Sequence, residues 1–536
     1  MEKRAVIAIV FSILILILYQ EWMARQYGTP PLPSREEKKV EKAPAPYPKP
    51  QPKLQEAETI AAPVEQAVKE IRVETDHYIA VFTSRGARLK SFILKDYYTS
   101  VDEESPLLEM ISSTPGVPYP LGVQLYGPNP SDDEGLIYSV QGSDLRLRGD
   151  TKGTLVFQAQ TPSGTTLTKK FTFFGSSYPI ELEFSVFGSN GVIPAGLLLS
   201  SEGGKKGPAK DAVFEGLLAL VDGKLIREGG EELAEGKELS GPVSWAGFGY
   251  TYFLFASIPE SETGQKLTVR QADPALVMDI GSQPGSNAGG KSRYTLFIGP
   301  KDLDILKSVG RELEQSIDFG WVRFIALPLL SILRFSHRFT ASYGIDIIIL
   351  TILMKLLLAP LTHKSFVSMK QMQKLQPQME RIKEKFKSDK EKLNKEIMEL
   401  YRRNKVNPLG GCLPMVLQFP VFIGLYNALR TPIELRHTSF MWIKDLSRPD
   451  WESLPINLAG WDVGIPVLVL LMGASMFAQM WMTPSAGDPN QRRMMLMMPV
   501  FFTAIFVTFP AGLTIYWFVN NILSIAQQYL INRMHR

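Results

Sequence analysis

A lysine stands alone in a strongly apolar stretch of the chain, ILTILMKLLLAP, which runs from Ile349 to Pro360. Its ammonium group, on Lys355, would cost roughly 2.5 to 3.5 kcal/mol at the centre of a bilayer. Polar residues on several apolar segments could offset this cost: Thr351 one turn away, Gln418 on a later segment, and Tyr516, Asn520, Ser524 and Gln527 along one face of the last. Together they predict a hydrated groove whose unpaired cation attracts transient negative charge.

Two plainer interpretations of these residues stay open. Lys355 lies eight residues before His363, so its side chain could extend to the near membrane surface. Each polar residue could also form an ordinary interhelical hydrogen bond. The acid in the same span, Asp346, is nine residues from Lys355, which is about 13 Å along a helix. The two groups therefore cannot pair on one straight helix.

Other residue types that carry chemistry do not gather in the sequence. The five histidines, His77, His337, His363, His437 and His535, are too scattered to form a ligand set. The single cysteine, Cys412, excludes an intrachain disulfide. We therefore expect no metal, no cofactor and no catalytic residue, and a protein that is not an enzyme.

One motif has the letters of a phosphate-binding loop, GSNAGGKS at residues 285–292. Such a loop must lead into a helix whose amino end faces the phosphates. The residues that follow, RYTLFIG, have a strand pattern instead. We expect a Gly-rich hairpin at this position and no bound nucleotide.

The amino-terminal half of the chain reads as an anchor, a linker and a β domain. Residues 1–22 hold Lys3 and Arg4 before an apolar run, which predicts an uncleaved signal anchor with its amino end in the cytoplasm. Residues 23–69 are rich in proline and predict an extended linker. Residues 70–300 repeat short alternating runs such as YIAVFTS and IELEFSVFG, which predict a large, exported antiparallel β-sandwich.

The carboxyl-terminal half is predicted to be a membrane-embedded helical core. Residues 301–342 predict a helical linker and an amphipathic helix that lies flat in the outer interface, with Trp321 and Phe324 buried there and arginines at the headgroups. Residues 343–536 hold five apolar segments, at 343–361, 411–429, 463–482, 494–508 and 513–530. Residues 362–410 carry 13 Lys or Arg and 6 acids, against 3 and 5 in residues 433–462. This bias predicts six spans in all, with both termini in the cytoplasm.

The basic segment of residues 363–408 predicts a cytoplasmic helical hairpin. Apolar residues at coiled-coil spacing form one seam, consisting of Met372, Leu375, Met379, Ile382 and Phe386. A second stripe, of Leu393, Ile397 and Leu400, would return along it. The stripes would form the core of the hairpin itself, and its solvated basic flanks suit ribosomal RNA or anionic lipid.

Three long strings resemble the YidC family of membrane protein insertases. They are KVNPLGGCLPMVLQFPVFIGLYNAL from residue 405, LAPLTHKSFVSMKQMQKLQPQMERIKEK from residue 358 and FPAGLTIYWFVNNILSIAQQYLI from residue 509. The resemblance covers the whole chain and implies the Gram-negative type: a signal anchor, a periplasmic β super-sandwich, an interfacial helix, a cytoplasmic hairpin and a five-helix core. It also implies the bacterial inner membrane.

The resemblance also implies roles for individual residues. The family's groove arginine falls on Lys355, which keeps the charge but loses the forked donors of arginine. Its neighbouring threonine falls on Thr351, its polar groove residue on Gln418, and its substrate-contacting aromatic positions on Tyr516 and Trp517. The family's β domain is similar to galactose mutarotases, whose chemistry uses paired histidines. This region holds only His77, so sugar epimerisation is not expected.

The function that the sequence predicts is therefore insertion and folding of inner-membrane proteins, alone or with the Sec translocon. Implied partners are nascent membrane proteins, the Sec translocon, the lipid bilayer, and the ribosome or signal recognition machinery through the basic cytoplasmic loops. Two alternatives stay open. One is an ion-coupled transporter that uses Lys355 as a gating charge, and the other is a passive Sec-associated scaffold.

Overall fold

The computed structural model describes residues 67–534 with internal gaps. The gaps are at residues 103, 127–129, 190, 203–212, 230–232, 234–235, 263–264, 273, 283–290, 388, 405, 407–412, 454, 459–460 and 484–488. The predicted signal anchor and nearly all of the predicted linker lie outside the described residues, as do Cys412 and His535. The chain divides into two compact units: a β unit, made of residues up to 299, and a helical unit, which takes residues 300–536 together with Tyr98–Pro106 and Tyr252–Leu254.

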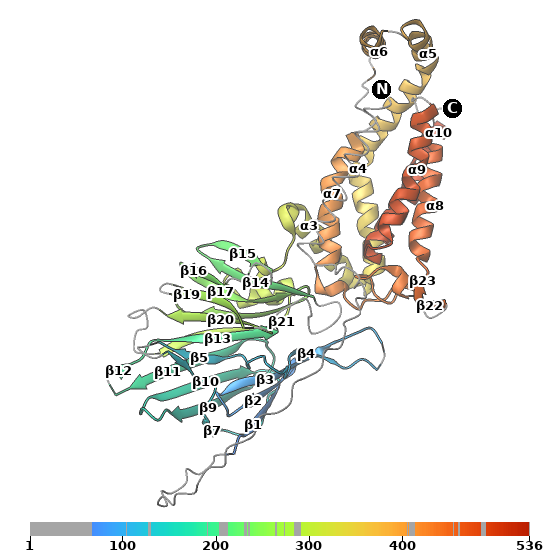
Figure 1. Cartoon of the computed structure of the whole chain (residues 1–536). Coiled ribbons are helices and arrows are strands. Elements are labelled where there is room, and N and C mark those ends of the chain that lie inside the picture. Colours follow the sequence, from blue (N-terminus) through green and yellow to red (C-terminus); the bar gives the residue numbers. More distant parts are fainter. Residues whose placement is uncertain are drawn as a thin grey trace, which may run out of the picture. The chain divides into compact units, whose positions relative to one another are not determined.

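The β unit is built from short strands in three sheets (Figure 1). In chain order the strands are β1 (Glu70–Glu74), β2 (Tyr78–Thr83), β3 (Arg88–Tyr98), β4 (Leu107–Ile111), β5 (Gly122–Leu125), β6 (Ser131–Asp132), β7 (Ser139–Gln141), β8 (Leu145–Arg146), β9 (Lys152–Gln160), β10 (Thr166–Phe174), β11 (Ile180–Gly188), β12 (Gly191–Val192), β13 (Ala195–Glu202), β14 (Phe214–Val221), β15 (Lys224–Glu228), β16 (Lys237–Ser240), β17 (Val243–Tyr250), β18 (Phe253–Pro259), β19 (Gln265–Ala272), β20 (Ala275–Ser282) and β21 (Lys291–Pro300). The predicted all-β domain is thus confirmed.

The sheets hold five, ten and six strands. Their orders are β4-β3-β2-β1-β8; β15-β14-β17-β18-β21-β11-β10-β9-β7, with β12 paired to β11; and β16-β19-β20-β13-β5-β6. Most neighbours pair antiparallel, whereas β1 and β8 pair in parallel. The motif with phosphate-loop letters leads into β21, which pairs with β11, and Lys291 Nζ bonds to Glu183. The helix that a phosphate site requires is therefore replaced by a strand.

Alternation along β10 explains how the core of the β unit forms. Its buried side chains are Leu167, Lys169, Phe171 and Phe173, the period of two that places alternate residues on one face. Phe82 packs between the rings of Phe171 and Phe173, at centroid distances of 4.8 and 5.6 Å. Lys169 is therefore buried on the face of β10 that otherwise carries apolar side chains.

A buried charge network accommodates that lysine. Lys169 Nζ lies 2.6 Å from Asp133 Oδ2 and also donates to the carbonyls of Gly86 and Leu121 at 2.6 and 2.8 Å. Asp133 has no exposed surface and accepts from Tyr138 Oη at 2.9 Å and from Arg88 Nη2 at 3.3 Å. Burial lowers the pKa of Lys169 to about 8, although the carboxylate of Asp133 opposes that shift.

The helical unit begins after β21. Its helices are α2 (Leu303–Val309), α3 (Arg323–Thr340), α4 (Tyr343–Lys374), α5 (Gln376–Lys385), α6 (Lys390–Arg403), α7 (Leu413–Arg430), α8 (Val467–Met482), α9 (Pro489–Phe506) and α10 (Ala511–Met534), with short 3-10 turns η2 (Leu313–Ser316), η3 (Gly320–Val322), η5 (Ile433–Leu435) and η6 (Asp450–Ser453) and a hairpin of β22 (Pro455–Leu458) and β23 (Trp461–Gly464). Helix α10 packs against α8 and α4, α8 packs against α9, and α3 packs against α7 and α4.

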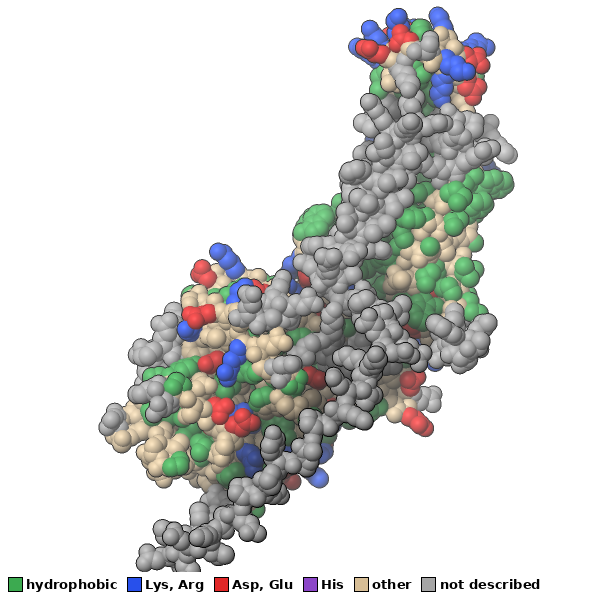
Figure 2. Space-filling view, viewed as in Figure 1, with side chains coloured by type: hydrophobic (Ala, Val, Ile, Leu, Met, Phe, Trp, Pro, Cys, Tyr) green, Lys and Arg blue, Asp and Glu red, His purple; other side chains and the backbone are tan. Residues whose placement is uncertain are grey.

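The bundle has two distinct ends (Figure 1). Within the helical unit, α5 and α6 lie at one end, and β22 and β23 lie at the other. Among the described residues, α4 is the one helix that is long and apolar enough to cross a membrane by length and composition, while α8 and residues 495–506 of α9 are shorter apolar helices. Apolar side chains cover much of the visible flank of the bundle, and charged ones gather over α5 and α6 (Figure 2).

The basic segment differs from the prediction in one respect. Helix α4 continues through Pro360 to Lys374, so that Met372 lies on the same helix as Lys355 and not on α5. The chain breaks at Leu375 and resumes as α5, because Pro377 stands in the first turn of a new helix. The seam is thus divided, although Leu375 and Met379 are buried, Ile382 and Phe386 are half-buried, and α5 packs on α6.

The buried network predicts a large loss of stability when its acid is removed. Asp133→Ala leaves Lys169 and Arg88 buried without their carboxylate, which should cost about 3 to 5 kcal/mol. Hydrogen exchange of the β10 amides in the full chain measures the loss. The matched control is Asp132→Ala, since Asp132 also pairs with Arg88 but its side chain is 37% exposed, and it should cost less than about 1 kcal/mol. Equal protection in both variants would contradict the assignment.

Candidate functional site

The candidate site is a line of polar side chains between α4 and α10. Lys355 Nζ donates to Ser524 Oγ at 2.5 Å, and the hydroxyl of Ser524 donates onward to the carbonyl oxygen of Asn520 at 2.7 Å. Because the serine proton is directed to Asn520, a lone pair of its oxygen remains for the ammonium group. Lys355 is half-buried, whereas Ser524 and Asn520 are buried.

The line continues from this contact in both directions along α10. Toward the end of the bundle that carries α5, Gln527 Nε2 donates to Thr362 Oγ1 at 3.0 Å. In the opposite direction, Gln418 Nε2 of α7 lies 3.5 Å from Tyr516 Oη. Hydrogen bonds between helices thus follow a single face of α10, at positions 516, 524 and 527. Asn520 lies on the same face and contributes only its backbone carbonyl, to Ser524 of the same helix.

No carboxylate balances the ammonium group of Lys355 within the part of the chain that the structure describes. Asp346, on the same helix, is fully buried and accepts instead from His337 Nδ1 at 2.8 Å and from Thr340 Oγ1 at 2.6 Å. His337 also stacks on Tyr343 with ring centroids 3.7 Å apart. This acid therefore fixes the corner between α3 and α4 and leaves the lysine charge uncompensated.

Two of the predicted site residues do not join the polar line. Thr351 is buried and donates to the carbonyl of Ile347, one turn back on its own helix, at 2.6 Å. Trp517 turns toward an aromatic cluster, in which it meets Phe422 and Phe506 edge-on at 5.7 Å each. Its buried indole Nε1 has no hydrogen-bond partner. The aromatic cluster joins side chains of α7, α9 and α10.

Helix α10 also has a second polar face, which the sequence reading missed. Asn521 Nδ2 donates to Ser475 Oγ of α8 at 3.1 Å, and Gln528 Nε2 donates to Thr483 Oγ1 at 2.8 Å. The seven-residue spacing of Asn521 and Gln528 was the available signal, since residues two turns apart share a face. Neighbouring glutamines thus point to different helices, Gln527 to α4 and Gln528 to α8.

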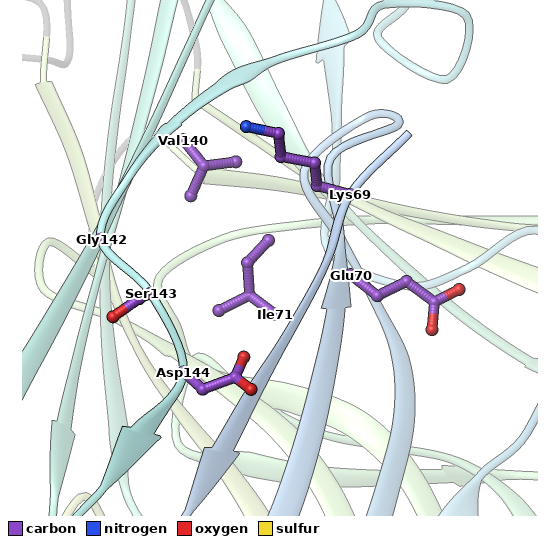
Figure 3. Close-up of a pocket in the computed structure, with 7 residues that line it drawn as sticks. All are labelled: Lys69, Glu70, Ile71, Val140, Gly142, Ser143 and Asp144. Carbon is purple, nitrogen blue, oxygen red and sulfur yellow. The ribbon is translucent and has the colours of Figure 1, made fainter. Parts of the chain in front are cut away.

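A separate cavity of about 440 Å³ lies in the β unit (Figure 3). Its lining consists of Lys69, Glu70, Ile71, Val140, Gly142, Ser143 and Asp144. The side chains of Ile71 and Val140 face each other across it, while Glu70 points away (Figure 3). None of the polar residues of α4 and α10 lines this cavity, so it is no part of the candidate site.

Comparisons with known proteins cover both units. Residues 70–332 match the family model described as the YidC periplasmic domain, and residues 335–536 match the model described as 60Kd inner membrane protein. A curated relative from Pelobacter propionicus, named membrane protein insertase YidC, is 39% identical over 553 residues, covering 100% of this chain and 99% of its own.

The chain belongs to the YidC insertase family.

Solved structures are more distant from this YidC family member. A crystal structure of an active YidC insertase aligns at 18% identity and a TM-score of 0.37, covering 86% of this chain and 92% of that one. A galactose mutarotase-like protein from Lactobacillus casei aligns over 43% of this chain and 100% of its own, at 13% identity and a TM-score of 0.27. Scores this low carry no structural argument, so the expected likeness of the β domain to mutarotases stays a prediction.

A cluster of charges joins α2, α3 and η5 at the end of the bundle that carries β22. Arg334 of α3 contacts Asp304, lies 3.9 Å from Asp302 and approaches Glu434 Oε1 to 3.5 Å. Burial raises the pKa of Glu434 to about 7, and the nearby carboxylates act in the same direction. The pKa of Arg334 is raised by the same three acids. Burial dominates at Glu434, because one guanidinium is shared among three carboxylates.

This cluster predicts a pH dependence of stability. A carboxyl group whose pKa is raised by folding stabilises the fold at low pH, and that stability is lost as the pH rises from 4.5 through about 7. Glu434→Gln should therefore reduce the fall in melting temperature between about pH 5 and about pH 8, as measured by thermal unfolding in detergent. Glu399→Gln, which alters an exposed acid on α6, should keep the wild-type profile. If Glu434→Gln kept the wild-type dependence of melting temperature on pH, Glu434 would not be its cause.

Proposed function

We propose that this YidC family member inserts membrane proteins through a groove along the polar line of α4 and α10. The observation that supports the proposal is the uncompensated ammonium group of Lys355, which is half-buried and bonded to a neutral hydroxyl. In a low-dielectric environment such a cation attracts an anionic or polar group strongly. The short polar terminus or loop of a client protein would meet the groove first and lose less hydration there than in lipid.

The client's apolar segment would then move sideways into the bilayer. Burial of its apolar surface supplies the driving force. A membrane potential that is positive outside would also draw acidic residues outward, with about 2.3 kcal/mol per charge per 100 mV. No covalent step, nucleotide or metal takes part in this route. Among the residues that the structure describes, no group of three His, Cys, Asp or Glu residues could hold a metal ion.

The two matched regions support a membrane orientation for the proposal. The β unit matches a periplasmic domain, so the end of the bundle with β22 and β23 would face the periplasm and the end with α5 and α6 the cytoplasm. Exposed Trp321 and Phe324, each 70% accessible at the start of α3, would lie in the outer interface. As predicted from the sequence, the proposed topology has six membrane spans, both termini in the cytoplasm and the core at residues 343–536.

The basic hairpin would then face the translation machinery. Its α6 ends in Arg402 and Arg403, and α5 ends in Lys383 and Lys385. These charges suit ribosomal RNA or the signal recognition machinery, while the Sec translocon is the expected partner for larger clients. Both partners belong to the proposal.

Charge substitutions at Lys355 test the central claim. In proteoliposomes, Lys355→Arg should retain insertion of a short single-span client, Lys355→Ala should reduce it, and Lys355→Glu should lower it by about tenfold or more, since the groove would repel acidic segments. Protease protection of the client measures insertion. Equal insertion by all three variants would reject the groove mechanism in favour of a passive scaffold.

Adjacent glutamines on α10 offer a matched pair. Gln527→Leu makes the groove face more apolar and should lower insertion of the same client several-fold, whereas Gln528→Leu alters the α8 face and should leave insertion near the wild-type level. Melting temperatures of both variants show whether either effect arises from unfolding. The mechanism would be contradicted if Gln528→Leu were the more defective of the two stably folded variants.

A further inference from the structure

Residues 431–453, between α7 and α8, form a loop over one end of the bundle. We call this segment the end loop. Three of its apolar side chains point inward, since Leu435 and Leu446 have no exposed surface and Ile443 is 2% exposed, whereas Met441 is exposed. A bridge between Phe440 and Ile443 fixes its turn, with reciprocal backbone hydrogen bonds of 2.9 Å. The end loop is thus a packed element rather than a loose connection.

The end loop caps α8 through Asp450. Helix α8 starts at Val467, and its own N-cap residue, Pro466, makes no side-chain hydrogen bond. Asp450 Oδ2 instead accepts from the backbone N–H of Leu468 at 2.7 Å, and the carboxylate is 1% exposed. A negative charge at a helix amino end satisfies otherwise unpaired amides and complements the helix dipole. Asp450 therefore ties α8 to the end loop.

The end loop also caps α10, here through its backbone. The N–H groups of Ala511 and Gly512 donate to the carbonyl oxygens of Arg448 and Leu446, at 2.8 and 2.9 Å. A Cβ atom on Gly512 would lie 3.3 Å from the Leu446 oxygen, so the glycine permits this close approach. The first turn of α10 thus has its amides bonded to the end loop.

Contact with α4 closes the remaining side. The ring of Phe440 packs so closely on Gly344, in the first turn of α4, that a Cβ atom there would lie 2.1 Å from ring carbons. The end loop therefore holds the starts of α4, α8 and α10 together. The groove line begins at Tyr516, five residues from Ala511, which is about 7.5 Å along the helix. Only this short distance separates the polar line from the capped end.

We propose that the end loop is the permeability seal of the groove, and that Asp450 is the residue that positions it. This inference rests on the groove of the proposed function. When the cap on α8 is lost, the end loop loosens at the start of α8, and water can pass from the groove around its closed end. The resulting path contains the charge of Lys355, so it should conduct anions in preference to cations.

Ion flux through proteoliposomes that contain the full chain tests the seal. Asp450→Ala should raise chloride flux by about tenfold over the wild type and raise potassium flux much less. Adding Lys355→Glu on that background should reverse the preference toward potassium. A merely structural role for Asp450 would not make the selectivity of a leak depend on a side chain of α4.

Two matched variants control for the loss of charge in the end loop. Asp450→Asn keeps an acceptor oxygen for the Leu468 amide and should remain nearly as tight as the wild type. Glu452→Gln removes a charge that pairs with Arg448 inside the end loop but leaves the carboxylate of Asp450 and its bond to α8 in place, so it should also remain tight. Should Asp450→Ala fail to fold, Phe440→Ala opens the α4 side and is expected to leak with the same anion preference.

Results of two kinds would overturn the proposal. One is a folded Asp450→Ala or Phe440→Ala protein whose flux equals that of the wild type. The other is a leak whose preference for chloride over potassium is unchanged by Lys355→Glu. Client insertion is measured separately, without an ion gradient, so that failure of the insertase function is distinguishable: Lys355→Glu alone should be tight to ions but defective in insertion, whereas Asp450→Ala should leak but still insert.

Discussion

The contact on which the site depends is the hydrogen bond from Lys355 to Ser524. An ammonium group between helices needs an acceptor, but a carboxylate would neutralise it and leave no attraction for another anion. A serine hydroxyl satisfies one donor and leaves the charge in place. Since Ser524 directs its own proton to Asn520, the acceptor is oriented before any client arrives. Helices α4 and α10 thus hold an ammonium group that is hydrogen-bonded but not neutralised.

The remaining polar contacts of the bundle maintain that arrangement. Asp346 is occupied by His337 and Thr340, which keeps a buried acid away from the lysine and fixes α3 to α4. On the far side of α10, Asn521 and Gln528 bond to α8. Helix α10 is therefore held from two sides by side-chain hydrogen bonds, one set around the charge and one set away from it.

Sequence patterns predicted most of the fold, because strands with period two and long apolar helices leave strong local signals. The polar residues of α10 were also visible, since their spacing places them on one face. Other features depend on tertiary contacts. Nothing in the strand pattern of β10 marks Lys169 for burial, and only Asp133, distant in sequence, explains it. The continuation of α4 through Pro360 was missed, because proline favours a helix end in the absence of other contacts.

The partners of Asp346, Glu434 and Asp450 were equally hidden from the sequence. Each lies in a turn or at a helix start, and each pairs with a group from another element. Trp517 was assigned through family resemblance alone, and the structure gives it aromatic neighbours and an indole nitrogen without a partner. Local pattern thus predicts which elements form, whereas long-range contacts decide which polar groups remain available.

The unbroken course of α4 has a mechanical consequence. The helix holds 32 residues and is thus about 48 Å long, and it carries Lys355 near its middle and the entry to α5 at its end. The helix runs on past Pro360, although this residue has no N–H to donate to the carbonyl of Leu356, so a tilt at one end is transmitted to the other. A small displacement of α5 and α6 would therefore be carried along α4 and would move the ammonium group relative to Ser524, while the packing of α8 against α10 stays unchanged.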